Sequence, residues 1–218
     1  MADPTSNTQQ PSAASNSTSS EPAAVLEFWF GALDDDHGFP SVWGQRWFGA
    51  DHNFDDTVRA QFEPLIHAIA AGQHDDWRAT ATGALALVIA LDQFTRNCFR
   101  GTPHMYKFDH LARQVANESL EHGFDWLVHP VQSVFFYMPF EHHEDLASQE
   151  RAVTLFQMLQ RGVNEKDRAQ YAGFLDHALA HRDIIARFGR FPHRNAIIGR
   201  TNTTAETHFL AAQRQSSL

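Results

Sequence analysis

The sequence contains a single cysteine, Cys98, among its 218 residues. One cysteine excludes an internal disulfide and a thiolate zinc cluster, and it suits a reducing compartment such as the cytoplasm. The longest uninterrupted apolar run, residues 84–91, is far shorter than the roughly 20 residues that a membrane-spanning helix needs. We therefore expect a cytoplasmic protein that has no membrane partner.

Several motifs that carry chemistry are also missing. The chain has no phosphate-cradling glycine loop, no dinucleotide fingerprint and no nucleophile-elbow serine, so no motif implies a cofactor. The run Glu141–Asp145 holds oxygen and nitrogen ligands, but the two Glu-x-x-His motifs of a carboxylate-bridged metal centre are missing, and we predict no metal site. A net charge of -9 argues against nucleic acid as a partner.

The composition that is present is that of a folded domain, with 43% hydrophobic and 20% charged residues. Residues 1–21 are polar and lack the apolar centre of a secretory signal, so we expect a disordered tail. Apolar residues then recur at helical spacing, and no segment alternates like a strand. The pattern predicts one all-α domain over residues 22–214, with about seven helices in antiparallel pairs.

Some helix boundaries can be predicted from local signals. Residues 84–91 are apolar on every side, which predicts a central buried helix that continues to Arg100. Thr102 followed by Pro103 predicts the start of the next helix. Pro139 should bend or break the helix that begins at Pro130.

Polar side chains gather in three regions of this otherwise apolar pattern. The last region, residues 181–200, contains five arginines but one acid, Asp183, and many large apolar residues. Because a buried guanidinium needs a carboxylate or phosphate partner, the matching anions must come from elsewhere in the chain or from a ligand. The candidate site residues are Asp92, Arg96, Asn97 and Arg100 in the first region, Glu141, His142 and Asp145 in the second, and His181, Arg187, Arg190, His193, Arg194 and Asn195 in the third.

Three interpretations of these residues remain open at the level of sequence. The acids and arginines can form a purely structural network. They can line a pocket for a small anionic ligand, with His181 or His193 as general acid or base oriented by Glu141 or Asp145. A helical scaffold can instead hold a peptide or protein partner in an open groove. A closed pocket favours a small ligand, and an open groove favours a peptide.

Four phrases of the sequence allow a family comparison: VLEFWFG, LDQFTRNCFRGTP, YMPFEHHEDLASQE and HRDIIARFGRFPHRNAIIGR. With these, the chain over residues 25–210 resembles the bacterial domain-of-unknown-function family nine hundred and twenty-four. The resemblance implies an all-helical, tetratricopeptide-like fold and no particular chemistry. The family pattern usually has proline at Thr95 and serine at His143, so the resemblance gives His143 no role.

Overall fold

A computed structural model of the chain describes residues 21–33 and 36–216, and these contain helices and no β-strand. The chain is therefore all-α, as predicted, whereas the predicted tail lies outside the described residues except for Glu21. None of the described helices combines the length and the apolar composition that crossing a bilayer requires. The α-helices are α1 (Pro22–Phe30), α2 (Val42–Phe48), α3 (His52–Ala70), α4 (Ala81–Val88), α5 (Thr95–Cys98), α6 (Asp109–Glu121), α7 (Pro130–Glu141), α8 (Leu146–Gly162), α9 (Arg168–Phe188) and α10 (Thr204–Ser216).

The centre of the domain is a continuous helical rod over residues 81–98. It consists of α4, a π-helical segment (Ile89–Phe94) and α5. The Thr80 hydroxyl caps its start by accepting a hydrogen bond from the Gly83 N–H at 3.1 Å. Residues 84–91 are each at most 2% exposed, and α1, α3 and α6 pack around the rod. The prediction of a central buried helix is therefore confirmed.

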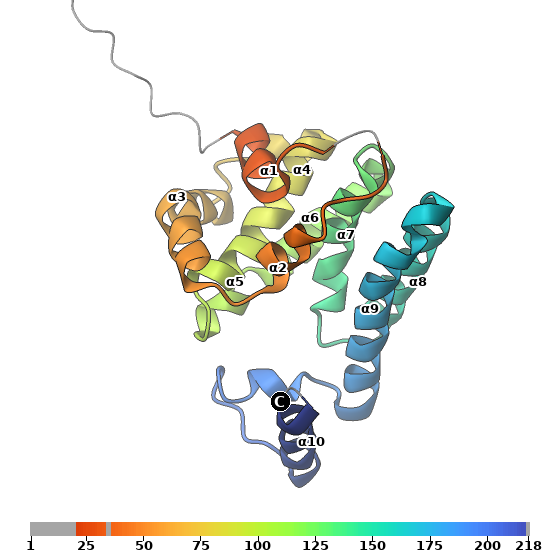
Figure 1. The fold of residues 1–218 in the computed structure, drawn as a ribbon. Helices are drawn as coiled ribbons and strands as arrows, with labels where there is room; N and C mark the ends of the chain where they lie inside the picture. Colours follow the sequence, from red (N-terminus) through yellow and green to blue (C-terminus); the bar gives the residue numbers. More distant parts are fainter. Residues whose placement is uncertain (1–20, 34–35, 217–218) are drawn as a thin grey trace, which may run out of the picture.

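Helices that follow one another in the chain pack side by side around the rod (Figure 1). α6 packs against α7, α7 against α8, and α8 against α9, with short connections that make these neighbours antiparallel. α10 lies beyond the C-terminal end of α9, at the bottom of Figure 1. The predicted antiparallel pairing is present in α6–α9, and the likeness to tetratricopeptide proteins stays a prediction.

Aromatic rings join α1, the rod and α7. The Trp29 ring centroid lies 5.6 Å from that of Phe94 and 5.9 Å from that of Phe135, and the Phe30 and Phe135 centroids are 5.1 Å apart. All four side chains are at most 1% exposed. Aromatic pairs of this kind contribute roughly 0.5–1.5 kcal/mol each beyond the area that they bury. This packing fixes α7 relative to the rod, and both carry polar residues of the candidate site at their C-terminal ends.

The sequence predicts that Pro139 bends or breaks its helix, and the predicted break is wrong. α7 continues through Pro139 to Glu141, and the His142 N–H still donates to the Met138 carbonyl at 2.8 Å. Because Pro139 lies in the last turn, the missing N–H removes one helical hydrogen bond and the helix ends soon afterwards in any case.

The predicted helix start at Thr102 and Pro103 is also wrong. Pro103 begins a 3-10 turn (Pro103–Tyr106), and α6 starts only at Asp109. The Thr102 hydroxyl does not cap a helix but donates to the Phe99 carbonyl at 2.8 Å. Thr102 therefore closes the turn that ends the rod.

Candidate functional site

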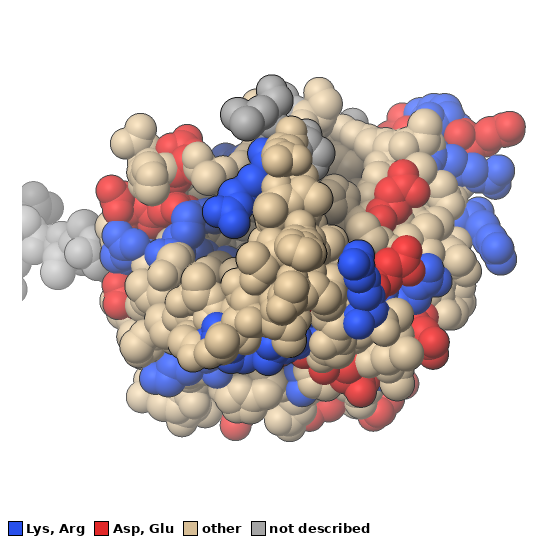
Figure 2. Space-filling view, turned by 90° about the horizontal axis from the view of Figure 1, so that it is seen from below, with Lys and Arg blue, Asp and Glu red and all other residues tan. Residues whose placement is uncertain are grey.

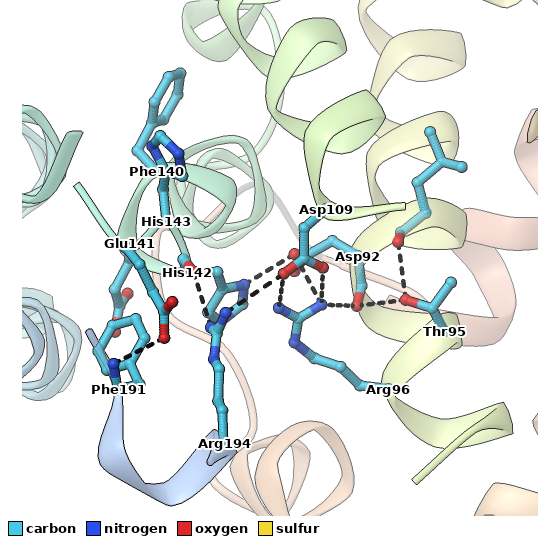
Figure 3. A network of polar contacts seen from close by, with 12 residues as sticks. Asp92, Thr95, Arg96, Asp109, Phe140, Glu141, His142, His143, Phe191 and Arg194 are labelled. Atoms are coloured by element: carbon cyan, nitrogen blue, oxygen red, sulfur yellow. Dashed lines mark hydrogen bonds and ion pairs between the residues drawn. The ribbon is translucent and has the colours of Figure 1, made fainter. Parts of the chain in front are cut away.

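Polar groups from all three predicted regions meet near the C-terminal end of α7 (Figure 3). Glu141 is the last residue of α7 and His142 follows it, while the π-helical segment supplies Asp92. A 3-10 turn after α9 (Pro192–Arg194) supplies Arg194. The structure thus brings together residues that are far apart in the sequence.

Asp92 is a completely buried carboxylate in this network. Its Oδ1 lies 2.8 Å from His142 Nδ1 and 3.0 Å from Arg96 Nη1, and the Gln93 amide donates to its Oδ2 at 2.5 Å. Burial alone would raise the pKa of Asp92, but the charges of Arg96 and His142 and the hydrogen bonds lower it to about 2. Asp92 is therefore ionised at neutral pH and orients both His142 and Arg96.

The backbone at Asp92 is π-helical, where the sequence predicts a regular α-helix. The Thr95 hydroxyl donates to the Leu91 carbonyl at 2.8 Å and to the Asp92 carbonyl at 3.1 Å, and Arg96 Nη1 also donates to the Asp92 carbonyl at 2.6 Å. A π turn disrupts the regular hydrogen bonds of a helix, and these side chains supply donors to carbonyls of the wider turn. Short π-helical turns are frequent at functional sites.

Asp109, the first residue of α6, is a network residue that the sequence analysis missed. Its Oδ1 and Oδ2 accept hydrogen bonds from Arg96 Nη1 and Nη2 at 3.0 and 3.1 Å, a two-pronged ion pair. Burial would lower the pKa of Arg96, but the negative charges of Asp92 and Asp109 raise it instead. The charge of Arg96 is thus fully compensated by the chain itself.

The charge of the buried Arg194 is compensated by the chain much more weakly than that of Arg96. Its guanidinium lies 4.5 Å from the Tyr106 ring centroid and 4.6 Å from that of Phe191, and Nη2 donates to the His142 carbonyl at 2.8 Å. The carboxylate that pairs with it in the described residues, Asp109, is 3.9 Å from Nη1, and the buried Nε has no acceptor there. Burial lowers the pKa of Arg194 and its neighbours do not reverse this shift. Figure 3 shows Arg194 reaching toward Asp109 and His142.

A second acid–histidine pair lies beside the first. His181 Nδ1 is 3.0 Å from Glu141 Oε1, and although burial would lower the pKa of His181, the hydrogen bond and charge of Glu141 raise it. The Phe191 ring contacts His181 and His193, with centroid distances of 5.2 and 5.4 Å. His193 is exposed overall, yet the protein atoms around its ring and the charge of Arg194 lower the pKa of His193.

Glu144 fastens the segment after α9 to the rest of the domain. Its carboxylate accepts the Phe191 N–H at 2.8 Å and two hydrogen bonds from Arg200, at 2.6 and 2.8 Å. Both residues stand in charged runs of the sequence, but neither is among the predicted site residues. The Glu144–Arg200 pair sets the position of the turn that carries Arg194.

Three of the predicted site residues lie outside the network. Asn97 donates to Asp55 Oδ1 of α3 at 2.8 Å, and Arg100 donates to both Asp55 oxygens at 2.5 and 2.9 Å. Arg100 does not share a helix face with Asp92, because α5 ends at Cys98 and the turn that follows redirects the chain. Asp145 caps α8 by accepting the N–H of residue 148 at 2.9 Å and does not orient a histidine of the network.

The remaining three predicted residues belong to the C-terminal segment alone. Arg190 forms a two-pronged ion pair with Glu206 of α10, at 2.6 and 2.8 Å. Arg187 is exposed and lies over aromatic rings of α9 and α10. Asn195 is buried and donates to Asn202 at 2.7 Å. These residues connect α10 with the end of α9 and with the loop between the two helices. They do not contact the Asp92 carboxylate.

The charges on the face seen from below are mixed in sign (Figure 2). Basic and acidic groups lie on both sides of a mostly uncharged ridge in the middle of this face. Among the described residues, no three His, Cys, Asp or Glu side chains are placed to hold a metal ion. The chemistry available to the network is that of histidines backed by carboxylates and of a buried, partly compensated arginine, which suits proton transfer and anion binding.

A comparison with protein-family models identifies the family of this chain. The family model described as bacterial protein of unknown function (DUF924) matches residues 25–214. A solved structure, a protein of unknown function, ATU0120, from Agrobacterium tumefaciens, is 42% identical, with a TM-score of 0.73, and the match covers 87% of this chain and 96% of that one. No curated protein matches. The chain therefore belongs to the DUF924 family of bacterial proteins.

Proposed function

We propose that this protein binds a small anionic molecule at the network around Arg194, as a cytoplasmic protein. The observation that supports this proposal is the difference between Arg194 and its neighbours. Arg96 and Arg200 each form a two-pronged pair with a carboxylate of the chain, whereas Arg194 is 8% exposed and has no carboxylate at hydrogen-bond distance in the described residues. A carboxylate or phosphate group of a ligand would satisfy donors that the chain leaves unpaired.

The network also contains groups that can move a proton once a ligand is bound. The Nδ1 of His142 is hydrogen-bonded to Asp92, and the Nε2 of His142 has no hydrogen-bond partner among the described residues. His181 is paired in the same way with Glu141, and His193 is exposed beside them. A carboxylate behind an imidazole fixes its tautomer and leaves the outer nitrogen as acid or base. We propose the His142–Asp92 and His181–Glu141 pairs as the acid–base groups of any reaction at this site.

The substitution Arg194→Gln tests the proposal. It removes the charge but keeps an amide that can donate to the His142 carbonyl. We expect inorganic phosphate or succinate to bind the unmodified protein in low-salt calorimetry. Since a charge-assisted hydrogen bond contributes about 1.5–3 kcal/mol, the variant should bind roughly 10- to 100-fold more weakly. Arg187→Gln is the matched control, because it removes an exposed arginine in the last turn of α9 and should leave affinity unchanged.

The outcome that contradicts the proposal is equal affinity in the Arg194→Gln and Arg187→Gln variants, or no binding to the unmodified protein. Arg194→Lys adds a second comparison, since it restores the charge without the planar fork. An affinity between those of the unmodified protein and of Arg194→Gln is expected.

A second candidate function is a helical scaffold for a peptide or protein, with a purely structural network. The observation that favours it is that the chain's own carboxylates pair with Arg96, Arg190 and Arg200. In that case Arg194→Gln would lower the melting temperature and change no small-molecule affinity. A partner recovered with the unmodified protein, together with the absence of any anion binding, would favour this alternative.

A further inference from the structure

A polar groove lies between α6 and the first turns of α8, apart from the network. Its volume is about 510 Å³, within the range of small-ligand sites. One wall comes from α6 and the other from α8, and the buried Phe140 of α7 also lines it. The polar lining residues used below are His110, Arg113, Asn117, Glu118, Ser148 and Arg151.

The two walls each supply an arginine. Arg113 of α6 is half-buried and makes no hydrogen bond or ion pair within the described residues. Arg151 of α8 is held in place, since its Nη1 donates to Asn117 Oδ1 at 2.7 Å and its guanidinium carbon lies 4.4 Å from the Phe140 ring centroid. No carboxylate forms an ion pair with Arg151 in that part of the chain, and the charge of Arg113 is attracted by Asp145 at longer range than an ion pair. Two guanidinium groups therefore line one groove, and neither forms an ion pair with a carboxylate of the described residues.

The acid that lines the groove does not neutralise them. Glu118 accepts hydrogen bonds from Arg78 at 2.6 Å and from Gln114 at 2.9 Å, so its charge is already matched by Arg78. His110 adds an imidazole to the lining, and Ser148 adds a hydroxyl that lies 2.8 Å from His143 Nδ1. On a chain with a net charge of -9, such a local surplus of positive charge is selective for anions.

We propose that the α6–α8 groove binds a small molecule that carries a phosphate or pyrophosphate group. Arg113 and Arg151 would hold the phosphate oxygens from opposite walls, and His110 and Ser148 would complete the set of donors. Guanidinium groups match the geometry of phosphate oxygens, and two of them suit a group that carries two or more negative charges. This site shares no residue with the network around Arg194 and does not depend on the function proposed there.

The experiment is calorimetry at low salt with inorganic pyrophosphate and, in a second arm, glucose 6-phosphate. Pyrophosphate should bind the unmodified protein, and Arg113→Gln should weaken it at least about tenfold, the loss of one charge-assisted contact. Arg161→Gln removes an exposed arginine from the far end of the same α8 helix and should leave affinity unchanged. Arg194→Gln should also leave this binding unchanged, which separates the two sites. Binding of glucose 6-phosphate would place the site among those for phosphate esters.

Three results would overturn the proposal. The first is no heat of binding with either probe. The second is equal weakening by Arg113→Gln and Arg161→Gln, which would show attraction by overall charge alone. The third is tighter binding of citrate than of pyrophosphate, which would assign the groove to carboxylates. Because Arg113 makes no hydrogen bond or ion pair within the described residues, the melting temperature of Arg113→Gln should be close to that of the unmodified protein.

Discussion

Replacing Asp92 by asparagine tests the physical centre of the network. The change keeps the size of the side chain but removes a buried negative charge that lies 3.0 Å from Arg96 and 2.8 Å from His142. In the variant, Arg96 retains Asp109, while His142 loses its carboxylate. Removing one partner of a buried ion pair typically costs about 3–5 kcal/mol, because the other charge stays buried without compensation.

The pKa of Asp92 gives a separate measure of the same interaction. Folding lowers this pKa from 3.8 to about 2, and at about 1.4 kcal/mol per pKa unit this corresponds to roughly 2.5 kcal/mol of stability. Because the folded pKa is below the unfolded one, the contribution is complete above the unfolded value of 3.8 and is lost as the pH falls through about 2. We therefore expect Asp92→Asn to be about 3 kcal/mol less stable at pH 7.

Urea denaturation at a series of pH values measures this difference. The gap between the unmodified protein and Asp92→Asn should narrow as the pH falls below about pH 4. Asp183→Asn is the control, since Asp183 is an exposed acid paired with Arg182 and its loss should cost less than about 1 kcal/mol. Equal stability of Asp92→Asn and the unmodified protein at pH 7, or a gap that stays constant down to pH 3, would refute the reasoning.

Two further predictions concern the residues around Phe191. In proton NMR titrations, the pKa of His181 should lie above the ordinary histidine value of 6.5, and the pKa of His193 should lie below it. The substitution Glu141→Gln should lower the pKa of His181 and not that of His193. An unchanged pKa of His181 in this variant would contradict the pairing of His181 with Glu141. Glu144→Gln removes the charge that holds two donors, so it should cost about 1–3 kcal/mol and speed hydrogen exchange at the Phe191 amide but not in α4. Exchange that rises equally in α4 would indicate general unfolding instead.

The parts of the fold that the sequence predicts well are those where one pattern dominates. Residues 84–91 are apolar on every side of a helix, and only the centre of the domain can bury all of them. The excess of arginine in residues 181–200 likewise required anions from elsewhere in the chain or from a ligand, and Arg190 and Arg200 pair with Glu206 and Glu144. Both predictions follow from a free-energy cost: that of leaving apolar side chains in water, and that of burying a charge without a partner.

The parts that the sequence does not predict depend on tertiary packing. Asp109 occupies the first turn of a helix, where an acid is ordinary, so nothing in its local sequence marks it as the partner of Arg96. Arg100 follows Asp92 by eight positions, which suggests a shared face, but the rod ends at Cys98 and Arg100 turns to Asp55. The π-helical turn at Asp92 depends on donors from Thr95 and Arg96 that only the folded arrangement reveals.

The arrangement of the C-terminal segment bears on whether Arg194 is structural. Glu144 already fastens that segment through Arg200 and the Phe191 N–H, and Phe191 itself is completely buried. Arg194 adds one hydrogen bond, to a backbone carbonyl, at the cost of burying a charge that Asp109 compensates only from 3.9 Å. An apolar side chain of similar length would pack between Tyr106 and Phe191 without that desolvation cost. Apart from its contacts with these two rings, the charge of Arg194 gains little from the chain, and this supports the proposal that an anion binds there.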